Sequence, residues 1–197
     1  MAHPYEHATP VPAGPLDLGA LVPGEGPCDL ELGFGRADFL LERARRHPER
    51  RLLGLEVRLK WVALAEEKLA ARGLTNARAY AADALRTLGR IEGAAVFETI
   101  FLHFPDPWWK RRHERRLLVA PDMLAQFERL LTTGGLLFIQ TDVPDRARAY
   151  RELLLSAPGF SDAGPVDENP FGIASHREKK CIQAGLPIHR LLFRGRG

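Results

Sequence analysis

The chain has 197 residues, of which 45% are hydrophobic, and this length and composition are typical of one globular domain. Its net charge of +3 is far below that of strongly basic nuclear proteins, so the placement of charge along the chain matters more than its total. Two distant cysteines, Cys28 and Cys181, match no metal-ligand spacing; we therefore expect no metal site and a reducing compartment.

Neither end of the chain nor its interior carries a membrane signal. No apolar run approaches the ~20 residues of a membrane span. The first ten residues, MAHPYEHATP, lack the basic start and the apolar segment of a signal peptide, so we expect a cytoplasmic protein.

The first 26 residues contain five prolines and four glycines. This composition predicts an N-terminal arm over residues 1–26, with at most a short helical turn around Asp17 to Leu21. We expect a single domain over residues 27–197. The arm has no basic run, so we assign it no nucleic-acid contacts.

From Cys28 onward, short apolar runs alternate with segments of helical periodicity. The predicted strands are CDLELGF from residue 28 and residues 51–56, 77–82, 96–104, 136–142 and 186–193, and the predicted helices are residues 37–47, 58–73, 117–131 and about 145–155. Strand and helix alternate through at least five units. This pattern predicts an α/β fold, with a mostly parallel sheet covered by helices on both faces.

Acidic residues recur where the predicted strands end, and ligands of such sheets bind at the carboxyl ends of the strands. Any one of these acids is equally consistent with a helix N-cap or a solvated loop, but five at one edge indicate a binding site. They are Glu31, Glu56, Asp83, Asp106 and Asp142.

The first strand-to-helix turn contains Gly33 and Gly35, and glycine permits positive φ and a close approach of a ligand to the backbone. The third glycine of a dinucleotide fingerprint would fall at Asp38, which argues against a dehydrogenase. Glu56 is well placed to accept hydrogen bonds from both hydroxyls of a ribose, and Asp83 from an exocyclic amine. This acidic edge suits a nucleoside with a cationic tail, such as S-adenosylmethionine.

Residues 104–116 read FPDPWWKRRHERR. The prolines on both sides of Asp106 restrict the backbone and hold its carboxylate after the fourth strand. Trp108 or Trp109 can stack on an exposed base, and five cations follow that can neutralise phosphates: Lys110, Arg111, Arg112, Arg115 and Arg116. The alternative interpretation is a solvated helix start with two core tryptophans. His113 fits a structural role or a phosphate contact better than that of a general base.

The E-x-G-x-G turn, the acids after strands two and three, and above all FPDPW followed by Lys and Arg-His resemble the bacterial tRNA (guanine-N7-)-methyltransferase family. The resemblance covers roughly residues 28–145 and a C-terminal Ser-His-Arg-Glu segment. It implies a class I methyltransferase fold (Rossmann-like, with a mostly parallel seven-stranded sheet), S-adenosylmethionine as donor and no metal. It also implies tRNA as partner, with 7-methylguanosine formed at position 46 in the variable loop.

Matched position by position, the resemblance implies one set of residues for the donor and another for guanine and RNA. The donor residues are Glu31, Gly33, Gly35, Glu56, Asp83 and Asp106. The guanine and RNA residues are Lys110, Arg112, His113, Arg115, Arg116, Asp142, Ser175 and Glu178. This chain departs from the family pattern at Arg36-Ala37, where many members have another small residue, at Trp109, where a histidine is usual, and at Arg177, where an aromatic residue is usual.

The chemistry of guanine N7 requires few catalytic groups, because that nitrogen carries an in-plane lone pair and no proton. We therefore expect Asp106 to orient the base and to stabilise the charge that moves onto it, and not to accept a proton. A small-molecule methyltransferase on the same fold and a non-catalytic RNA-binding subunit remain as alternatives. The sequence leaves open whether the protein is a monomer or a homodimer, and which tRNAs it uses.

Overall fold

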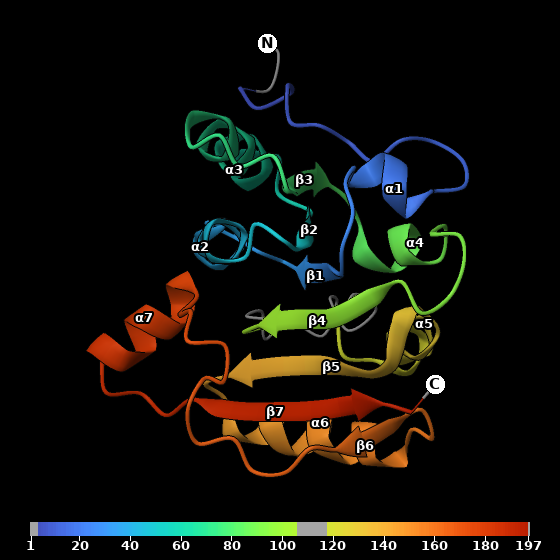
Figure 1. The fold of residues 1–197 in the computed structure, drawn as a ribbon. Coiled ribbons are helices and arrows are strands. Elements are labelled where there is room, and N and C mark those ends of the chain that lie inside the picture. The colour runs from blue at the N-terminus through green and yellow to red at the C-terminus, as the bar shows by residue number, and fades with distance from the viewer. Residues whose placement is uncertain (1–3, 106–117, 197) are drawn as a thin grey trace.

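The computed structural model describes residues 4–105 and 118–196. Seven strands form one sheet in the order β3-β2-β1-β4-β5-β7-β6, which Figure 1 shows as a stack of strands with helices around it. The strands are β1 (Cys28–Leu32), β2 (Arg51–Glu56), β3 (Ala77–Ala81), β4 (Phe97–His103), β5 (Leu131–Thr141), β6 (Phe160–Asp162) and β7 (His189–Gly195). Strands β3, β2, β1, β4 and β5 run parallel, and β7 is antiparallel to both of its neighbours.

Helices cover both faces of this sheet. They are α1 (Leu18–Leu21), α2 (Asp38–Arg46), α3 (Leu59–Ala71), α4 (Ala84–Leu88), α5 (Pro121–Leu130), α6 (Pro144–Ser156) and α7 (His176–Gln183). Side chains of α1, α4, α5 and α6 form the larger hydrophobic cluster on one face. Side chains of α2 and α3 form a second cluster on the other face, and a smaller aromatic cluster lies beside it around Phe101 and Phe138.

The predicted mostly parallel sheet with helices on both faces is confirmed. The predicted starts of three elements were wrong, and one of them is β7, which begins at His189 and not at residue 186. Strand β5 begins at Leu131 and not at residue 136, because Leu131 pairs with Phe97 before a register shift admits Gly134 and Gly135. Pro121 begins α5 four residues later than predicted. The sequence prediction also missed α4, β6 and α7, which are short and lack a long apolar periodicity.

The predicted N-terminal arm lies against the domain. The short helix α1 begins after Asp17, whose side chain accepts a hydrogen bond from the backbone N–H of Ala20. Two isolated bridges connect the arm to the rest of the chain, Pro10 to Ala81 and Leu16 to Ile91. Leu16 and α1 are part of the larger core cluster, so the apolar side chains of the arm contribute to the core.

Within residues 4–105 and 118–196, no helix has the length and apolar character needed to cross a membrane.

A buried carboxylate joins four elements on the face of α2. Asp29 in β1 accepts hydrogen bonds from Arg43 of α2, at 3.0 and 2.9 Å, and from Arg50 before β2, at 2.9 and 2.6 Å. Arg50 also pairs with Glu98 of β4. The hydrogen bond with Asp29 raises the pKa of Arg50, which therefore stays charged. These contacts fix α2 against β1, β2 and β4. The carboxyl ends of these strands, at the opposite edge of the sheet, carry the predicted acids of the binding site.

We expect Asp29→Asn to lower the free energy of unfolding by about 3–5 kcal/mol, because it leaves the buried guanidinium of Arg43 without a counter-charge and leaves Arg50 paired with Glu98 alone. Urea denaturation followed by circular dichroism measures this change. The matched control is Glu42→Gln, which removes a partly exposed acid that pairs with Arg45 and Arg46 on α2. The control is expected to cost about 1 kcal/mol or less. Equal losses in the two variants would contradict the structural role of Asp29.

Candidate functional site

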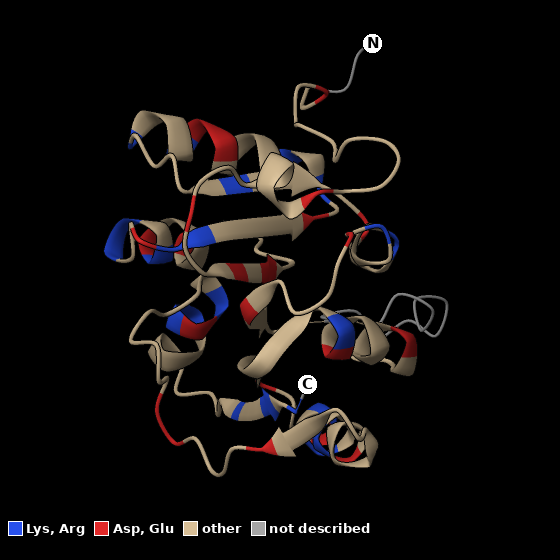
Figure 2. Ribbon diagram, turned by 45° about the vertical axis from the view of Figure 1, so that its right-hand side comes forward, with Lys and Arg blue, Asp and Glu red and all other residues tan. Residues whose placement is uncertain are grey.

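The carboxyl edge of the parallel strands brings together acids that are far apart in the sequence. Glu31 lies in β1, Glu56 ends β2, Asp83 caps α4 just after β3, and Asp142 follows β5. The fifth predicted acid, Asp106, lies outside the described residues, as do Lys110, Arg112, His113, Arg115 and Arg116. In Figure 2 the longer helices α2, α3, α5, α6 and α7 each carry both signs of charge.

Glu56 is 3% exposed, and its carboxylate is fully engaged by donors within the chain. The backbone N–H of Gly35 donates to Oε2 at 3.0 Å, and that of Arg58 donates to Oε1 at 3.0 Å. The Arg58 guanidinium donates to the same two oxygens at 3.1 and 3.2 Å. A carboxylate offers about four lone-pair sites, so four donors fill it.

The turn between β1 and α2 needs its glycines for backbone reasons. Gly33 and Gly35 have φ of +69° and +53°, and Ala37 enters α2 with φ of +61°. A Cβ atom on Gly33 or Gly35 would meet no heavy atom closer than 3.7 Å. The left-handed backbone at Gly33 and Gly35, and not a lack of space for a Cβ atom, therefore explains why both positions are glycine.

Glu31 forms a buried pair with His103, the last residue of β4. Oε1 of Glu31 lies 3.0 Å from Nδ1 of His103. A carboxylate only accepts hydrogen bonds, so Nδ1 carries the hydrogen. Oε2 of Glu31 and Nε2 of His103 have no hydrogen-bond partner among the described residues. A buried carboxylate oxygen without a donor is costly, so this oxygen is suited to bind a cationic or hydrogen-donating ligand group.

The end of β4 is strained where it enters the FPDP segment. Phe104 has φ of +54°, a left-handed conformation that is uncommon for an aromatic residue. Its N–H donates to the carbonyl of Gln140 at 2.8 Å, which holds the strained residue against β5. Backbone strain of this kind clusters at binding and catalytic sites. The side-chain amide of Gln140 is itself buried, with no partner among the described residues.

The C-terminal residues Ser175 and Glu178 are used inside the fold. The hydroxyl of Ser175 accepts from the N–H of Glu178 at 3.3 Å and caps α7. The Glu178 side chain is buried, and its two oxygens accept from Arg190 at 3.0 Å and from Asn169 at 2.9 Å. The structure thus places both residues beside the carboxyl edge, with their polar groups already paired.

Asp142 pairs with Arg177, which departs from the family pattern. Its hydrogen bond raises the pKa of Arg177. On the same helix, Lys179 contacts Asp38 at 3.2 Å, and His176 lies 3.5 Å from it. Burial acts to raise the pKa of Asp38, but Lys179 and then His176 outweigh it, and the net pKa is lowered. Ion pairs thus fix α7 to both β5 and α2.

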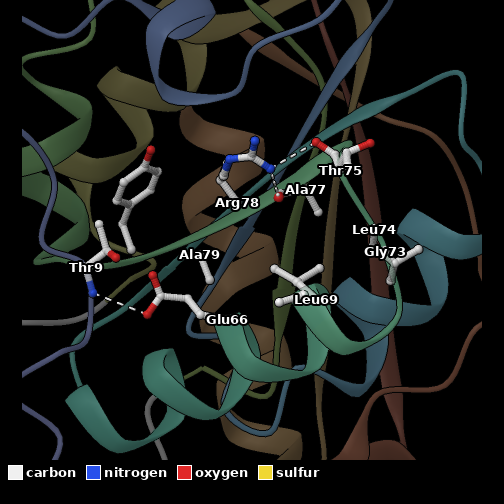
Figure 3. Close-up of a pocket in the computed structure, with 11 residues that line it drawn as sticks. Thr9, Glu66, Leu69, Gly73, Leu74, Thr75, Ala77, Arg78 and Ala79 are labelled. Carbon is white, nitrogen blue, oxygen red and sulfur yellow. Dashed lines mark hydrogen bonds between the residues drawn. The ribbon is translucent and has the colours of Figure 1, made fainter.

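A hollow on the described surface lies away from this edge. Figure 3 shows the residues that line it, between the arm, α3 and the outer strand β3. Its volume is about 510 Å³. The side chain of Glu66 accepts from the N–H of Thr9 at 3.3 Å across it, and Arg78 donates to the carbonyls of Thr75 and Ala77. None of the predicted site residues lines this hollow.

Among the described residues, no group of three or more His, Cys, Asp or Glu side chains could hold a metal ion.

Five parallel strands, an antiparallel β7 between β5 and β6, and acids at the carboxyl edge define the class I S-adenosylmethionine-dependent methyltransferase fold. The solved structure of the 16S rRNA methyltransferase KamB is similar, with a TM-score of 0.63 and 18% identity over 90% of this chain and 92% of that one. A family profile described as a putative methyltransferase matches residues 25–191.

Sequence relatives identify the family. A tRNA (guanine-N(7)-)-methyltransferase of Synechococcus sp. (strain JA-3-3Ab) is 36% identical over 166 residues, which cover 83% of this chain and 70% of the relative. The protein of the same name from Myxococcus xanthus (strain DK1622) is 34% identical over 179 residues, or 89% and 87% of the two chains. This chain belongs to the tRNA (guanine-N(7)-)-methyltransferase family.

Sequence reasoning missed the residues that pair with the predicted acids. His103 lies in an apolar run that was interpreted only as a strand, so it was not singled out as a site residue. Arg58 was treated as the start of a helix, although its position two residues after Glu56 is a local signal for a backbone contact. No local pattern pointed to Asn169 or Arg190, because their contacts with Glu178 depend on the course of the chain after β6.

We expect His103→Leu to weaken S-adenosylmethionine binding by roughly 10- to 100-fold, because Glu31 loses its hydrogen-bond donor. His103→Asn should recover most of the affinity, since its amide can donate from the place of Nδ1. Calorimetric titration of both folded variants measures the effect. If the leucine and asparagine variants bind the donor equally well, the Glu31–His103 bond does not position the donor.

Proposed function

We propose that this chain transfers the methyl group of S-adenosylmethionine to N7 of the guanine at position 46, in the variable loop of tRNA. The observation that carries the proposal is the buried carboxylate of Glu56 beside the Gly33–Gly35 turn, in a chain whose relatives are tRNA (guanine-N(7)-)-methyltransferases. The proposal includes the site residues given below, each assigned from its position in the sequence and its contacts.

The residues of the β1–β3 edge fit the donor. In the proposed complex Glu56 accepts hydrogen bonds from the two ribose hydroxyls, and the nucleoside lies against the backbone of the Gly33–Gly35 turn. The Asp83 side chain uses Oδ1 to cap α4, with the Arg86 N–H at 3.0 Å, and we assign its other oxygen to the exocyclic amine. Oε2 of Glu31, which has no partner among the described residues, suits the ammonium group of the donor.

The acceptor side is assigned from the sequence, because its centre lies outside the described residues. We propose that Asp106 orients the guanine and that Lys110, Arg112, His113, Arg115 and Arg116 contact RNA phosphates. Asp142, Ser175 and Glu178 complete the guanine site in this proposal. Since Asp142 and Glu178 are paired with arginines in the structure, guanine N–H groups would have to share or replace those arginine contacts.

The proposed reaction needs alignment and charge stabilisation more than proton transfer. The N7 lone pair attacks the methyl carbon as its bond to sulfur breaks, and positive charge passes from the sulfonium to the purine ring. No proton leaves N7, so no general base is required. A carboxylate beside the ring stabilises the charge that appears there, which is the role we assign to Asp106.

The proposal predicts that radiolabelled methyl groups from S-adenosylmethionine enter an unmodified tRNA transcript that carries guanosine at position 46. The same transcript with adenosine at that position should accept none, because the reacting nucleotide is absent. Scintillation counting after acid precipitation gives the result. Equal labelling of the two transcripts would exclude position 46, and labelling of small acceptors alone would exclude a tRNA methyltransferase.

We expect Asp106→Asn to lower the single-turnover methylation rate by on the order of 10²-fold, the scale for the loss of one electrostatic stabiliser. The parent rate should vary little between about pH 6.5 and 8.5, because an unperturbed aspartate is ionised throughout that range. Rapid-quench measurements at saturating donor and tRNA test both points. A parent rate that climbs about tenfold per pH unit, with the climb lost in the variant, would show Asp106 acting as a base.

A further inference from the structure

Three cationic side chains surround one tryptophan near the Gly33–Gly35 turn. Trp61 lies in the first turn of α3, half-buried against the α2–α3 cluster. The guanidinium carbons of Arg36 and Arg58 lie 5.3 and 5.8 Å from its ring centroid, and the ammonium of Lys60 lies 5.4 Å from it. Attraction between each cation and the ring holds the three side chains in one place.

These cations have little negative charge near them. Within the described parts of the chain, Arg36 and Lys60 form no ion pair, and Arg58 pairs only with Glu56. Two acids farther along α3 are directed to the arm, since Glu66 accepts from the Thr9 N–H and Glu67 lies 3.9 Å from His7. Grouped like charges repel, and an incoming anion relieves that repulsion.

Arg58 is also bound to the residue that we assign to the donor ribose. Its guanidinium occupies one lone-pair site on each oxygen of Glu56, and backbone N–H groups occupy the other two. Two ribose hydroxyls can therefore reach Glu56 only if the guanidinium leaves. The backbone donors are fixed, whereas the Arg58 side chain is 56% exposed, so its guanidinium can leave Glu56 for solvent and remain beside Trp61.

We propose that Arg36, Arg58 and Lys60 on Trp61 form a phosphate-binding patch for the RNA substrate, and that bound donor releases Arg58 from Glu56 to complete it. This inference rests on the proposed function and adds to it a second RNA contact, apart from the basic segment after Asp106. Before the donor binds, the carboxylate of Glu56 neutralises Arg58. After the donor binds, that positive charge is available to a phosphate. By linkage, RNA binding then favours donor binding to the same degree.

The test is the salt dependence of binding of an unmodified tRNA transcript, measured with and without S-adenosylhomocysteine. This compound keeps the ribose and has no methyl group to transfer. For the parent, we expect the slope of log affinity against log salt concentration to become steeper by about 0.9 when the compound is present, the value for one additional phosphate contact. Arg36→Ala and Lys60→Ala should each flatten the slope by about 0.9 under both conditions.

Arg58→Ala separates the two parts of the inference. Its slope should be the same with and without S-adenosylhomocysteine, because no charge is released. It should also bind that compound about two- to fivefold more tightly, the scale of one partly exposed ion pair that no longer competes. The matched control is Arg72→Ala, which removes an exposed cation at the other end of α3 and should keep both slopes of the parent.

If the Arg36 and Lys60 variants have the same slopes as the parent, the proposed phosphate-binding patch is contradicted. A parent slope unaffected by S-adenosylhomocysteine would overturn the release of Arg58. Either result can occur in a parent that methylates tRNA, which leaves the proposed function intact. If the parent binds the transcript but transfers no methyl group to it, the proposed function is contradicted. The salt-dependence slopes of the parent and its variants still test the phosphate-binding patch in that case.

Discussion

The parallel pairing of β3, β2, β1, β4 and β5 is the constraint on which the rest of the structure depends. Parallel strands place all their carboxyl ends at one edge, so residues separated by more than a hundred positions, such as Glu31 and Asp142, become neighbours of a common site. Each crossover helix must return the chain to the opposite edge. The Asp29 ion pairs at the buried face of α2 hold the first of these crossovers in place.

Three acids of the site are already paired inside the protein, whereas Glu31 keeps one oxygen without a partner among the described residues. Glu56 is paired with Arg58, Asp142 with Arg177, and Glu178 with Arg190 and Asn169. Unpaired carboxylates packed at one edge would repel one another and lower the stability of the fold. Internal cations remove that cost, and ligand groups that bind the same oxygens compete with them. Competition of this kind makes ligand binding dependent on side chains that are otherwise regarded as structural.

Local sequence patterns predicted the parallel sheet and its acidic edge, because strand periodicity and strand-end acids are short-range signals. After Gly159 they predicted the last strand, which overlaps β7, but missed β6 and α7, which are short and lie where the chain is held by Arg190 and other distant partners. The contact between Glu31 and His103 could not be predicted from local patterns either, since it joins β1 to β4 across 72 positions. The roles of the site residues, the arm boundary at residue 26 and the cytoplasmic location stay predictions.

The account depends most directly on N7 of one guanine as the nucleophile. A tRNA with 7-deazaguanosine at position 46 has a C–H group in place of that nitrogen and keeps the Watson–Crick edge unchanged. The measurement is methyl transfer from S-adenosylmethionine to this tRNA, together with its binding affinity. The account predicts parent-like binding and no transfer. Transfer at the normal rate would show that the methyl group is placed on another atom and would contradict the account.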